Sequence, residues 1–190
     1  MDTNVSTVDG FESGVATVAF VDLAGFSAIT DVYGDASAIA VLGRFEELVR
    51  QALAGVAPPI KWMGDEAMFG FPDPATALQV LGRLLPACRS EPRIPLTRTG
   101  IHHGPVLRRS NDLFGSTVNI AARIAALASP GQLLASRPVA DIAMRRAVPK
   151  RCFNSANSLS RPMNVAGCSG RLFGVVSSER SAGNSARSCG

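Results

Sequence analysis

The stretch that decides the fold is I-K-W-M-G-D-E-A-M-F-G-F, residues 60–71. Its outer parts are apolar enough to form buried strands, and the Gly64-Asp65 pair at its centre is typical of a tight hairpin turn. The same stretch carries charged groups at Lys61, Asp65 and Glu66. Charged groups beside buried strands cost free energy unless they are paired, solvated or bound to an ion. The sequence therefore raises the question of what pairs with these charges or binds to them.

Strand-like and helix-like segments alternate on both sides of this hairpin. The expected segments are a strand at 15–22, a helix at 28–55, a helix that begins at Pro74 after the N-cap Asp73, a strand near 96–102, a loop through Gly104-Pro105, a helix at 116–127, a strand at 132–136 and a short helix at 139–146. This order predicts an α+β fold, a ferredoxin-like βαββαβ core with an additional C-terminal helix and strand. In such a core the end of the first strand, at Asp22, approaches the hairpin turn at Asp65.

The chain has 190 residues, the size of one ordinary domain. We divide it into a polar leader at 1–14, a folded domain at 15–150, and an atypical basic, Ser-rich tail at 151–190 that we expect to be partly disordered. The net charge of +4 belongs to the tail, because residues 1–150 hold 14 Lys and Arg against 14 Asp and Glu. A neutral folded body argues against a nucleic-acid surface.

Two further features concern the expected location. The N-terminus is polar and acidic, so no secretory signal is visible. The longest uncharged run, 124–136, is thirteen residues long and contains Pro130 and Gly131, whereas a membrane-spanning helix needs about 20 apolar residues. We expect a soluble, cytoplasmic protein that contacts no membrane, with its four cysteines unpaired.

Asp22 and Asp65 each end a strand at a glycine-bearing turn, in V-D-L-A-G and M-G-D-E. Two carboxylates brought close repel each other, and one or two divalent cations remove that repulsion. Mg²⁺ prefers oxygen ligands and keeps several waters, so two carboxylates plus substrate phosphates are enough. The alternative is that Asp65 is only a turn residue and Asp22 a strand-end cap. The spacing alone leaves both interpretations open.

The expected helix 116–127 is apolar or small on nearly every side except at Asn119 and Arg123. These two residues are four apart and therefore share one face of the helix. One interpretation is an arginine that reaches outward to water, with Asn119 as a local hydrogen-bonding group. The other is a substrate-facing pair, in which Arg123 offers planar donors to phosphate and Asn119 holds a sugar or a phosphate. Asp112 and Lys61 are two more polar groups near apolar structure.

Four motifs together resemble the catalytic domain of class III nucleotidyl cyclases. They are F-V-D-L-A-G-F-S, K-W-M-G-D-E, R-T-G-I-H-H-G and D-L-F-G-S-T-V-N-I-A-A-R. Each is moderate evidence alone, but they occur in order with their internal spacings kept. The resemblance covers about residues 15 to 147, and the ferredoxin-like core expected above is the fold of that family.

The resemblance implies a role for each matching residue. Asp22 and Asp65 match the two aspartates that bind two divalent cations, Mg²⁺ or Mn²⁺. Asn119 matches the asparagine that orients the ribose, and Arg123 matches the arginine that stabilises the transition state. Arg98 matches an arginine that contacts the terminal phosphates in some members.

Lys61 and Asp112 match the pair that recognises adenine in adenylyl cyclases, whereas guanylyl cyclases usually carry glutamate and cysteine there. The chemistry agrees, because adenine offers an acceptor at N1 and a donor at N6. The implied activity is that of an adenylyl cyclase, which converts ATP to 3′,5′-cyclic AMP and pyrophosphate. Glu66 has no family role that we can assign, and a solvated or paired hairpin residue is the preferred interpretation.

In this family the active site lies between two catalytic domains. One domain supplies the metal-binding aspartates and the other supplies the groups that match Lys61, Asp112, Asn119 and Arg123. This chain carries both sets, which implies a homodimer with two shared sites. The segment 105–111 is short, whereas many members have a longer β-arm there that holds the partner.

Two other functions are compatible with parts of the pattern. A diguanylate cyclase has a G-G-D/E-E-F loop that superficially resembles M-G-D-E, but the N-I-A-A-R helix and Lys61 argue against it. A catalytically silent, nucleotide-binding dimerisation module is the second alternative. The tail at 151–190 keeps it open, because the strands that usually end the family domain are not recognisable there.

Overall fold

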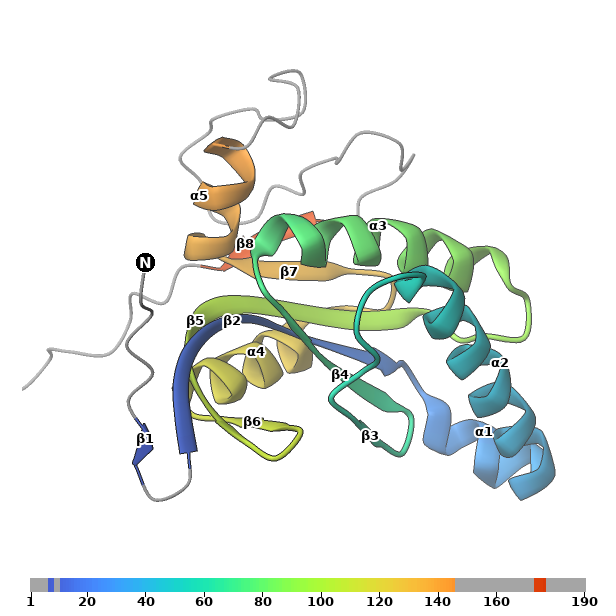
Figure 1. The fold of residues 1–190 in the computed structure, drawn as a ribbon. Helices are drawn as coiled ribbons and strands as arrows, with labels where there is room; N and C mark the ends of the chain where they lie inside the picture. The colour runs from blue at the N-terminus through green and yellow to red at the C-terminus, as the bar shows by residue number, and fades with distance from the viewer. Residues whose placement is uncertain (1–6, 9–10, 146–172, 177–190) are drawn as a thin grey trace, which may run out of the picture.

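The computed structural model describes residues 7–8, 11–145 and 173–176, whose strands form one eight-stranded sheet (Figure 1). The strands are β1 (Thr7–Val8), β2 (Phe11–Leu23), β3 (Lys61–Met63), β4 (Glu66–Phe71), β5 (Thr97–Arg109), β6 (Asp112–Phe114), β7 (Leu133–Ser136) and β8 (Phe173–Val176). Their order in the sheet is β3-β4-β2-β5-β7-β8, while β1 pairs with β2 and β6 pairs with β5.

Strands β2 to β5 form the expected ferredoxin-like core. The sheet places β2 between β4 and β5, with β3 outside β4, and every pairing among these four strands is antiparallel. The additional helix and strand are present as predicted, as α4 (Ser116–Leu127) and β7, and the structure shows that β7 joins β5 in parallel. Strand β8 extends the same edge, in parallel with β7.

The other helices are α1 (Phe26–Tyr33), α2 (Asp35–Leu53), α3 (Pro74–Ser90) and α5 (Arg137–Arg145). Figure 1 shows α3 and α4 on opposite faces of the sheet. The larger core packs buried residues of α2, α3 and α5, such as Phe45, Leu81 and Val139, against the first face. A smaller core packs Ala121 and Ala125 of α4 against the second. The two faces of the sheet are therefore covered by different helices.

The decisive stretch forms the hairpin that its sequence predicts. Strands β3 and β4 pair across the Gly64-Asp65 turn, where Gly64 has φ 65°, a value that costs glycine no side-chain clash. The helix cap that follows is also confirmed, because Asp73 Oδ1 accepts hydrogen bonds from the backbone N–H groups of Ala75 at 2.8 Å and Thr76 at 3.1 Å.

The single helix expected at 28–55 is wrong. The structure has α1 and α2 instead, separated by Gly34 with φ 77° and ψ 169°. An α-helix cannot contain that conformation, and glycine is the residue that reaches it without strain. Helix α1 thus ends at Tyr33, and the chain changes direction before α2 begins.

The strand expected near 96–102 continues through the expected loop at Gly104-Pro105 and ends at Arg109. Its partner β2 also begins earlier than predicted, so the two strands pair over the twelve positions from Glu12 to Leu23. Strand β6 then folds back on β5, with Asp112 opposite Arg109. The short segment 105–111 therefore belongs to an extension of the sheet, in which β5 pairs with β2 on one side and with β6 on the other.

Most of the leader at 1–14 and of the tail at 151–190 lies outside the described residues, and so does the expected disorder of the tail. Cys88 is buried and free, and the other three cysteines also lie outside the described part. Among the described helices, none combines the length and the apolar character that crossing a membrane requires.

Candidate active site

A row of charged side chains crosses the end of β2. Asp22 stands opposite Glu66 of β4 and opposite Arg98 of β5, and residues paired across strands point to the same face. Phe20, two positions before Asp22, packs in the core that α4 covers, so the row lies on that face. Asp65 comes directly before Glu66 in the hairpin turn. The structure thus brings Asp22 and Asp65 together, as the topology predicts.

The three carboxylates of this row influence one another. Burial raises the pKa of Asp65, and the neighbouring charge of Asp22, which is within hydrogen-bonding reach, raises it further. The pKa of Glu66 is also raised, first by burial and then by the charges of Asp22 and Asp65, while Arg98 acts in the opposite direction. The row therefore holds more negative charge than its one guanidinium neutralises.

Arg98 binds Asp22 directly, a contact that the sequence did not predict. Its Nε donates a hydrogen bond to Asp22 Oδ2 at 2.8 Å, and its Nη2 donates to the same oxygen. The side chain of Asp22 is 15% exposed and that of Arg98 is 38% exposed. Only the register of β2 against β5 makes the pair foreseeable, because the two residues are 76 positions apart in the chain.

The donor set of this row fits a divalent cation. Asp22 and Asp65 offer carboxylate oxygens, which Mg²⁺ and Mn²⁺ prefer, and a cation would remove the repulsion between them. Within the described residues, no three His, Cys, Asp or Glu side chains form a group that could hold a metal ion by themselves. A cation at the two aspartates would therefore need further ligands from water or from phosphate.

Lys61 and Asp112 form a second group. Lys61 Nζ donates to Asp112 Oδ2 at 2.7 Å, while the backbone N–H of Leu113 donates to Asp112 Oδ1 at 2.8 Å. The ammonium group also lies 5.9 Å from the centre of the Phe114 ring. Lys61 pairs with Met68, which packs in the core that α4 covers, so this group shares the face of the carboxylate row. The two residues expected to read one base are therefore neighbours.

Asn119 and Arg123 form the third group, on α4. Both are exposed, and neither makes a hydrogen bond or ion pair through its side chain with another described residue. The helix buries Ala121 and Ala125 against the sheet, and at 100° per residue Asn119 and Arg123 lie on the opposite side. Their side of α4 therefore faces away from the sheet that carries Asp22.

The two adjacent histidines of β5 do not join these groups. His103 Nδ1 lies 2.8 Å from Thr17 Oγ1, and His102 Nδ1 lies 2.7 Å from Ser136 Oγ. Burial lowers the pKa of both rings, so they are held neutral near pH 7. Their contacts are those of structural histidines.

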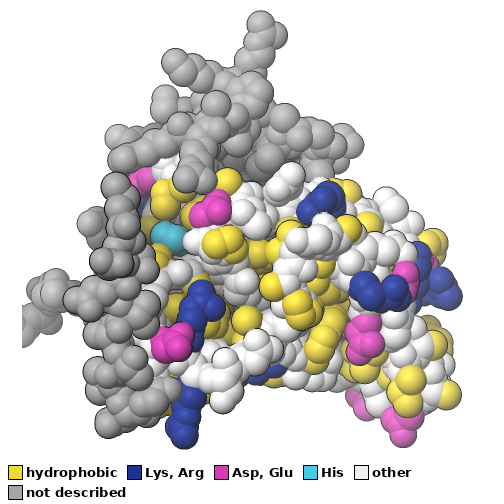
Figure 2. Space-filling model, in the orientation of Figure 1, with side chains coloured by type: hydrophobic (Ala, Val, Ile, Leu, Met, Phe, Trp, Pro, Cys, Tyr) yellow, Lys and Arg dark blue, Asp and Glu magenta, His cyan; other side chains and the backbone are white. Residues whose placement is uncertain are grey.

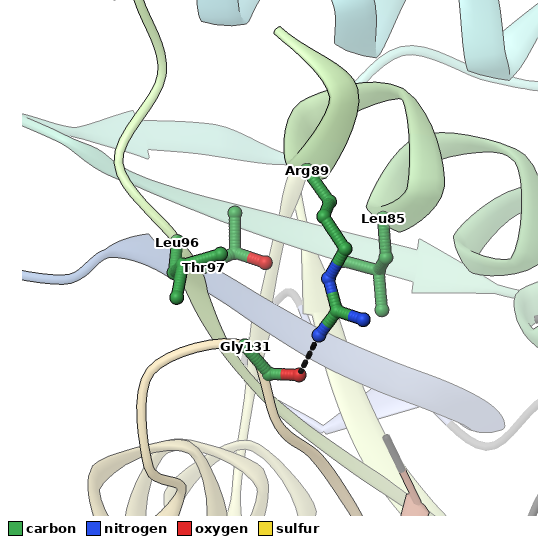
Figure 3. A pocket seen from close by; sticks show the side chains of 5 residues that line it. All are labelled: Leu85, Arg89, Leu96, Thr97 and Gly131. Atoms are coloured by element: carbon green, nitrogen blue, oxygen red, sulfur yellow. Dashed lines mark hydrogen bonds between the residues drawn. The ribbon is translucent and has the colours of Figure 1, made fainter. Parts of the chain in front are cut away.

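A shallow pocket lies elsewhere, between the end of α3, the start of β5 and the loop before β7. It is lined by Leu85, Arg89, Leu96, Thr97 and Gly131, and Arg89 Nη2 donates to the carbonyl oxygen of Gly131 at 3.2 Å (Figure 3). Thr97 is the partner of Leu23, whose side chain is in the larger core. This pocket is therefore on the face opposite the charged row.

The molecular surface shows how the charges are distributed. On the face shown in Figure 2, described Lys and Arg side chains lie in separate places among hydrophobic and acidic ones. No continuous basic surface is visible among the described residues of that face. The expectation that the domain binds no nucleic acid stays a prediction.

Comparison with known proteins identifies sequence relatives. No protein-family model matches the chain. It is 34% identical over 125 residues to a pH-sensitive adenylate cyclase of Mycobacterium tuberculosis, covering 66% of this chain and 32% of that protein. It is also 34% identical over 121 residues to an adenylate cyclase of Streptomyces griseus, covering 62% and 30%. The chain thus spans about a third of the length of these curated relatives.

Solved structures show the same fold. An adenylate/guanylate cyclase/hydrolase of Silicibacter pomeroyi matches with a TM-score of 0.62 at 25% identity, covering 80% of this chain and 95% of the other. An adenylate cyclase of Trypanosoma brucei, solved in its monomeric state, matches with a TM-score of 0.67 at 18% identity, covering 84% and 91%. The similarity extends over most of each solved chain.

Proposed function

The chain belongs to the class III nucleotidyl cyclase catalytic domains, and from this premise we propose that it is an adenylyl cyclase. The reaction converts ATP to 3′,5′-cyclic AMP and pyrophosphate. The ribose 3′-oxygen forms a bond to the α-phosphorus, and the bond from that phosphorus to the pyrophosphate oxygen breaks. The observation that carries this choice of substrate is the ion pair of Lys61 and Asp112 at 2.7 Å. The proposal includes a cytoplasmic location, because ATP is supplied there.

Base recognition rests on this pair. The Lys61 ammonium donates to N1 of adenine, and the Asp112 carboxylate accepts from the N6 amino group. Guanine reverses this pattern, because it carries a donor at N1 and an acceptor at O6. A guanine would therefore leave the lysine and the carboxylate facing groups of their own kind, which is costly in a partly buried site.

The carboxylates of Asp22 and Asp65 would hold two divalent cations, Mg²⁺ or Mn²⁺. The chemistry supplied there is a lower pKa for the 3′-hydroxyl and neutralisation of the triphosphate charge. The pairing of β2 with β4 and β5 fixes the backbone of Asp22 and places its side chain beside Glu66 and Arg98. Arg98 is paired with Asp22 across the strands, and its guanidinium would contact the terminal phosphates.

Asn119 orients the ribose, and Arg123 donates to the phosphate as charge develops on it. Both side chains are exposed on the side of α4 that faces away from their own sheet. This placement favours a homodimer, in which the α4 groups of one subunit act with the Asp22 and Asp65 carboxylates of the other. Catalysis would then consist of positioning and charge stabilisation, with two equivalent sites in each dimer.

The first test is to incubate the purified chain with ATP and Mn²⁺ and to measure cyclic AMP. We expect product from the parent chain and a rate lower by about a hundredfold or more from Asp22→Ala, the cost of one lost charged group at such a site. Circular dichroism and the oligomeric state of both proteins provide the control for folding. A folded, dimeric parent that yields no cyclic AMP would contradict the proposal.

Two alternatives are separated by the same assay. Binding of ATP without turnover would identify a catalytically silent nucleotide-binding dimerisation module. One observation favours that module: Arg98 already forms an ion pair with Asp22, one of the two carboxylates that the metal-dependent reaction needs. Cyclic diguanylate formed from GTP would identify a diguanylate cyclase instead.

A further inference from the structure

The contact between Arg98 and Asp22 gives each residue a partner other than its expected one. Arg98 directs two donors, Nε and Nη2, to a single oxygen, Asp22 Oδ2. The proposed function assigns Asp22 to a divalent cation and Arg98 to phosphate. An oxygen that accepts two N–H groups from a guanidinium has little room to coordinate a metal ion, and the same N–H groups cannot also donate to phosphate. The observed pair therefore competes with the two assigned contacts, because it occupies one of the two carboxylate oxygens of Asp22 and two donor nitrogens of Arg98.

One member of this pair is fixed and the other can move. Asp22 is paired with both β4 and β5, and its neighbours Val21 and Leu23 are fully buried. Arg98 stands at the second position of β5, and its side chain is 38% exposed at the end of a long flexible chain of methylenes. Because the guanidinium is partly solvated and a phosphate would replace its carboxylate partner, Arg98 can leave Asp22 without becoming a buried, unpaired charge. Movement of Arg98 alone would free Asp22.

The charges favour such an exchange when a triphosphate is near. Asp22 offers one negative charge to Arg98, whereas a nucleoside triphosphate carries several. The phosphate oxygens are also spaced to accept two N–H groups of one guanidinium. Once Arg98 has left Asp22, the row of Asp22, Asp65 and Glu66 has no guanidinium among its carboxylates. That change increases the affinity of the row for a divalent cation.

We propose that Arg98 is a positioning residue that closes Asp22 to the metal ion until a nucleoside triphosphate draws the guanidinium away. Binding of the metal and of the nucleotide is then positively coupled through one side chain. By linkage, each ligand increases the affinity for the other by the same factor. The inference rests on the proposed function for the identity of the two ligands, but the exchange itself is a property of the Arg98–Asp22 pair.

The test measures Mn²⁺ binding to the full chain without nucleotide, by electron paramagnetic resonance of the free ion and by calorimetry. We expect Arg98→Gln to bind Mn²⁺ about tenfold more tightly than the parent, within the usual range for coupling between two sites. The gain must disappear in the double variant Arg98→Gln/Asp22→Asn, because it acts through Asp22. An unchanged Mn²⁺ affinity in Arg98→Gln, or a gain that persists in the double variant, would overturn the proposal.

Arg108→Gln is the matched control. Arg108 lies on the same strand, ten positions from Arg98 and therefore on the same face, and it pairs with Glu12 at the far end of β2. The substitution removes the same charge without touching Asp22, so the Arg108→Gln variant should bind Mn²⁺ with the affinity of the parent. A gain as large as that of Arg98→Gln would show that net charge, and not the contact, controls the metal.

A second measurement follows the guanidinium itself. Nuclear magnetic resonance detects the Nε–H groups of the arginines. The resonance that is present in the parent and absent from Arg98→Gln is assigned to Arg98. Adding a non-reactive ATP analogue in the presence of a chelator should shift this resonance, because the donor changes its acceptor without any metal. A resonance that stays in place while the analogue binds would refute the exchange. Both measurements are independent of turnover, so failure of this inference and failure of the cyclase proposal give different results.

Discussion

Lys61 and Asp112 show how much of the proposed specificity rests on two side chains. They lie 2.7 Å apart and are each about one third exposed, so the pair is accessible to a base. The backbone N–H of Leu113 holds the second carboxylate oxygen of Asp112 at 2.8 Å. This leaves the carboxylate oriented when the lysine turns to a substrate. The site would therefore select its base by donor and acceptor pattern and not by shape alone.

Replacing these two residues should change the preferred substrate from ATP towards GTP. The double variant Lys61→Glu/Asp112→Cys offers an acceptor where adenine needs a donor, and we expect the ratio of kcat/KM for ATP to that for GTP to fall by about a hundredfold. The ratio is measured with both nucleotides under the same metal concentration. Arg83→Gln, at an exposed position of α3 on the other face of the sheet, should leave the ratio at the parent value. Retention of the ATP preference by the double variant would show that base recognition is assigned to the wrong residues.

At the scale of elements, the close contact of α4 with β5 depends on Gly100. A Cβ built on this residue would lie 2.6 Å from the carbonyl oxygen of Ala121 and would also clash with the backbone nitrogen of Ala125. Both clashing groups are backbone atoms of the helix, which cannot rotate away as a side chain can. The helix that carries Asn119 and Arg123 can therefore approach the sheet only because residue 100 has no side chain.

Gly100→Ala should lower the free energy of unfolding by about 1–3 kcal/mol or more, the usual cost of overpacking. Gly43→Ala is the control, because Gly43 is an exposed position inside α2 with no atom within 4 Å of an added Cβ. It should raise the free energy of unfolding by about 0.5–1 kcal/mol, since alanine favours the helix. Urea denaturation followed by circular dichroism measures both. Equal effects of the two substitutions would mean that α4 can shift to accommodate the methyl group.

The elements that the sequence predicted well have local signals. The hairpin has its Gly64-Asp65 turn, α3 has the Asp73 cap, and α4 has a regular apolar pattern, so each forms where it was expected. The break at Gly34 and the continuation of β5 past Gly104-Pro105 have no such signal. Gly34 could equally stand within a helix, and β5 continues because distant β2 supplies its hydrogen-bonding partners.

The residues of the candidate site were also predictable where a local motif marks them and not where a distant contact places them. Motifs indicated Asp22, Asp65, Lys61 and Asp112, and the strand order predicted that the first two would meet. The pair of Arg98 and Asp22 depends on a register between residues 76 positions apart, which no local pattern encodes. Contacts of this kind become visible only when the sheet is assembled.

At the scale of the whole molecule, the groups assigned to one reaction lie in different layers of the chain, some on the sheet and some on the outer side of the helix that covers it. The carboxylates of Asp22 and Asp65 stand at the end of β2, whereas Asn119 and Arg123 lie on the side of α4 that faces away from the sheet. A single chain would therefore have difficulty in applying both groups to one nucleotide. Two chains that face each other would combine them twice.

Complementation between inactive variants tests this arrangement. Asp65→Ala and Arg123→Ala should each be nearly inactive alone, because each damages both sites of its homodimer. Mixed in equal amounts, they should recover about a quarter of the parent rate, since half of randomly formed dimers are mixed and each mixed dimer has one intact site. Cyclic AMP formation is measured after the mixture has equilibrated. Absence of recovery, with mixed dimers demonstrated by affinity tags, would reject shared sites.

The contact at Gly100 also has a genetic consequence. Every single-base change in a glycine codon is either silent, a stop, or a change to a residue with a side chain. At most positions some of those residues are tolerated, but here even the smallest of them meets the backbone of α4. No single-base change that replaces Gly100 is therefore neutral. A lineage that keeps α4 packed against β5 must keep this glycine.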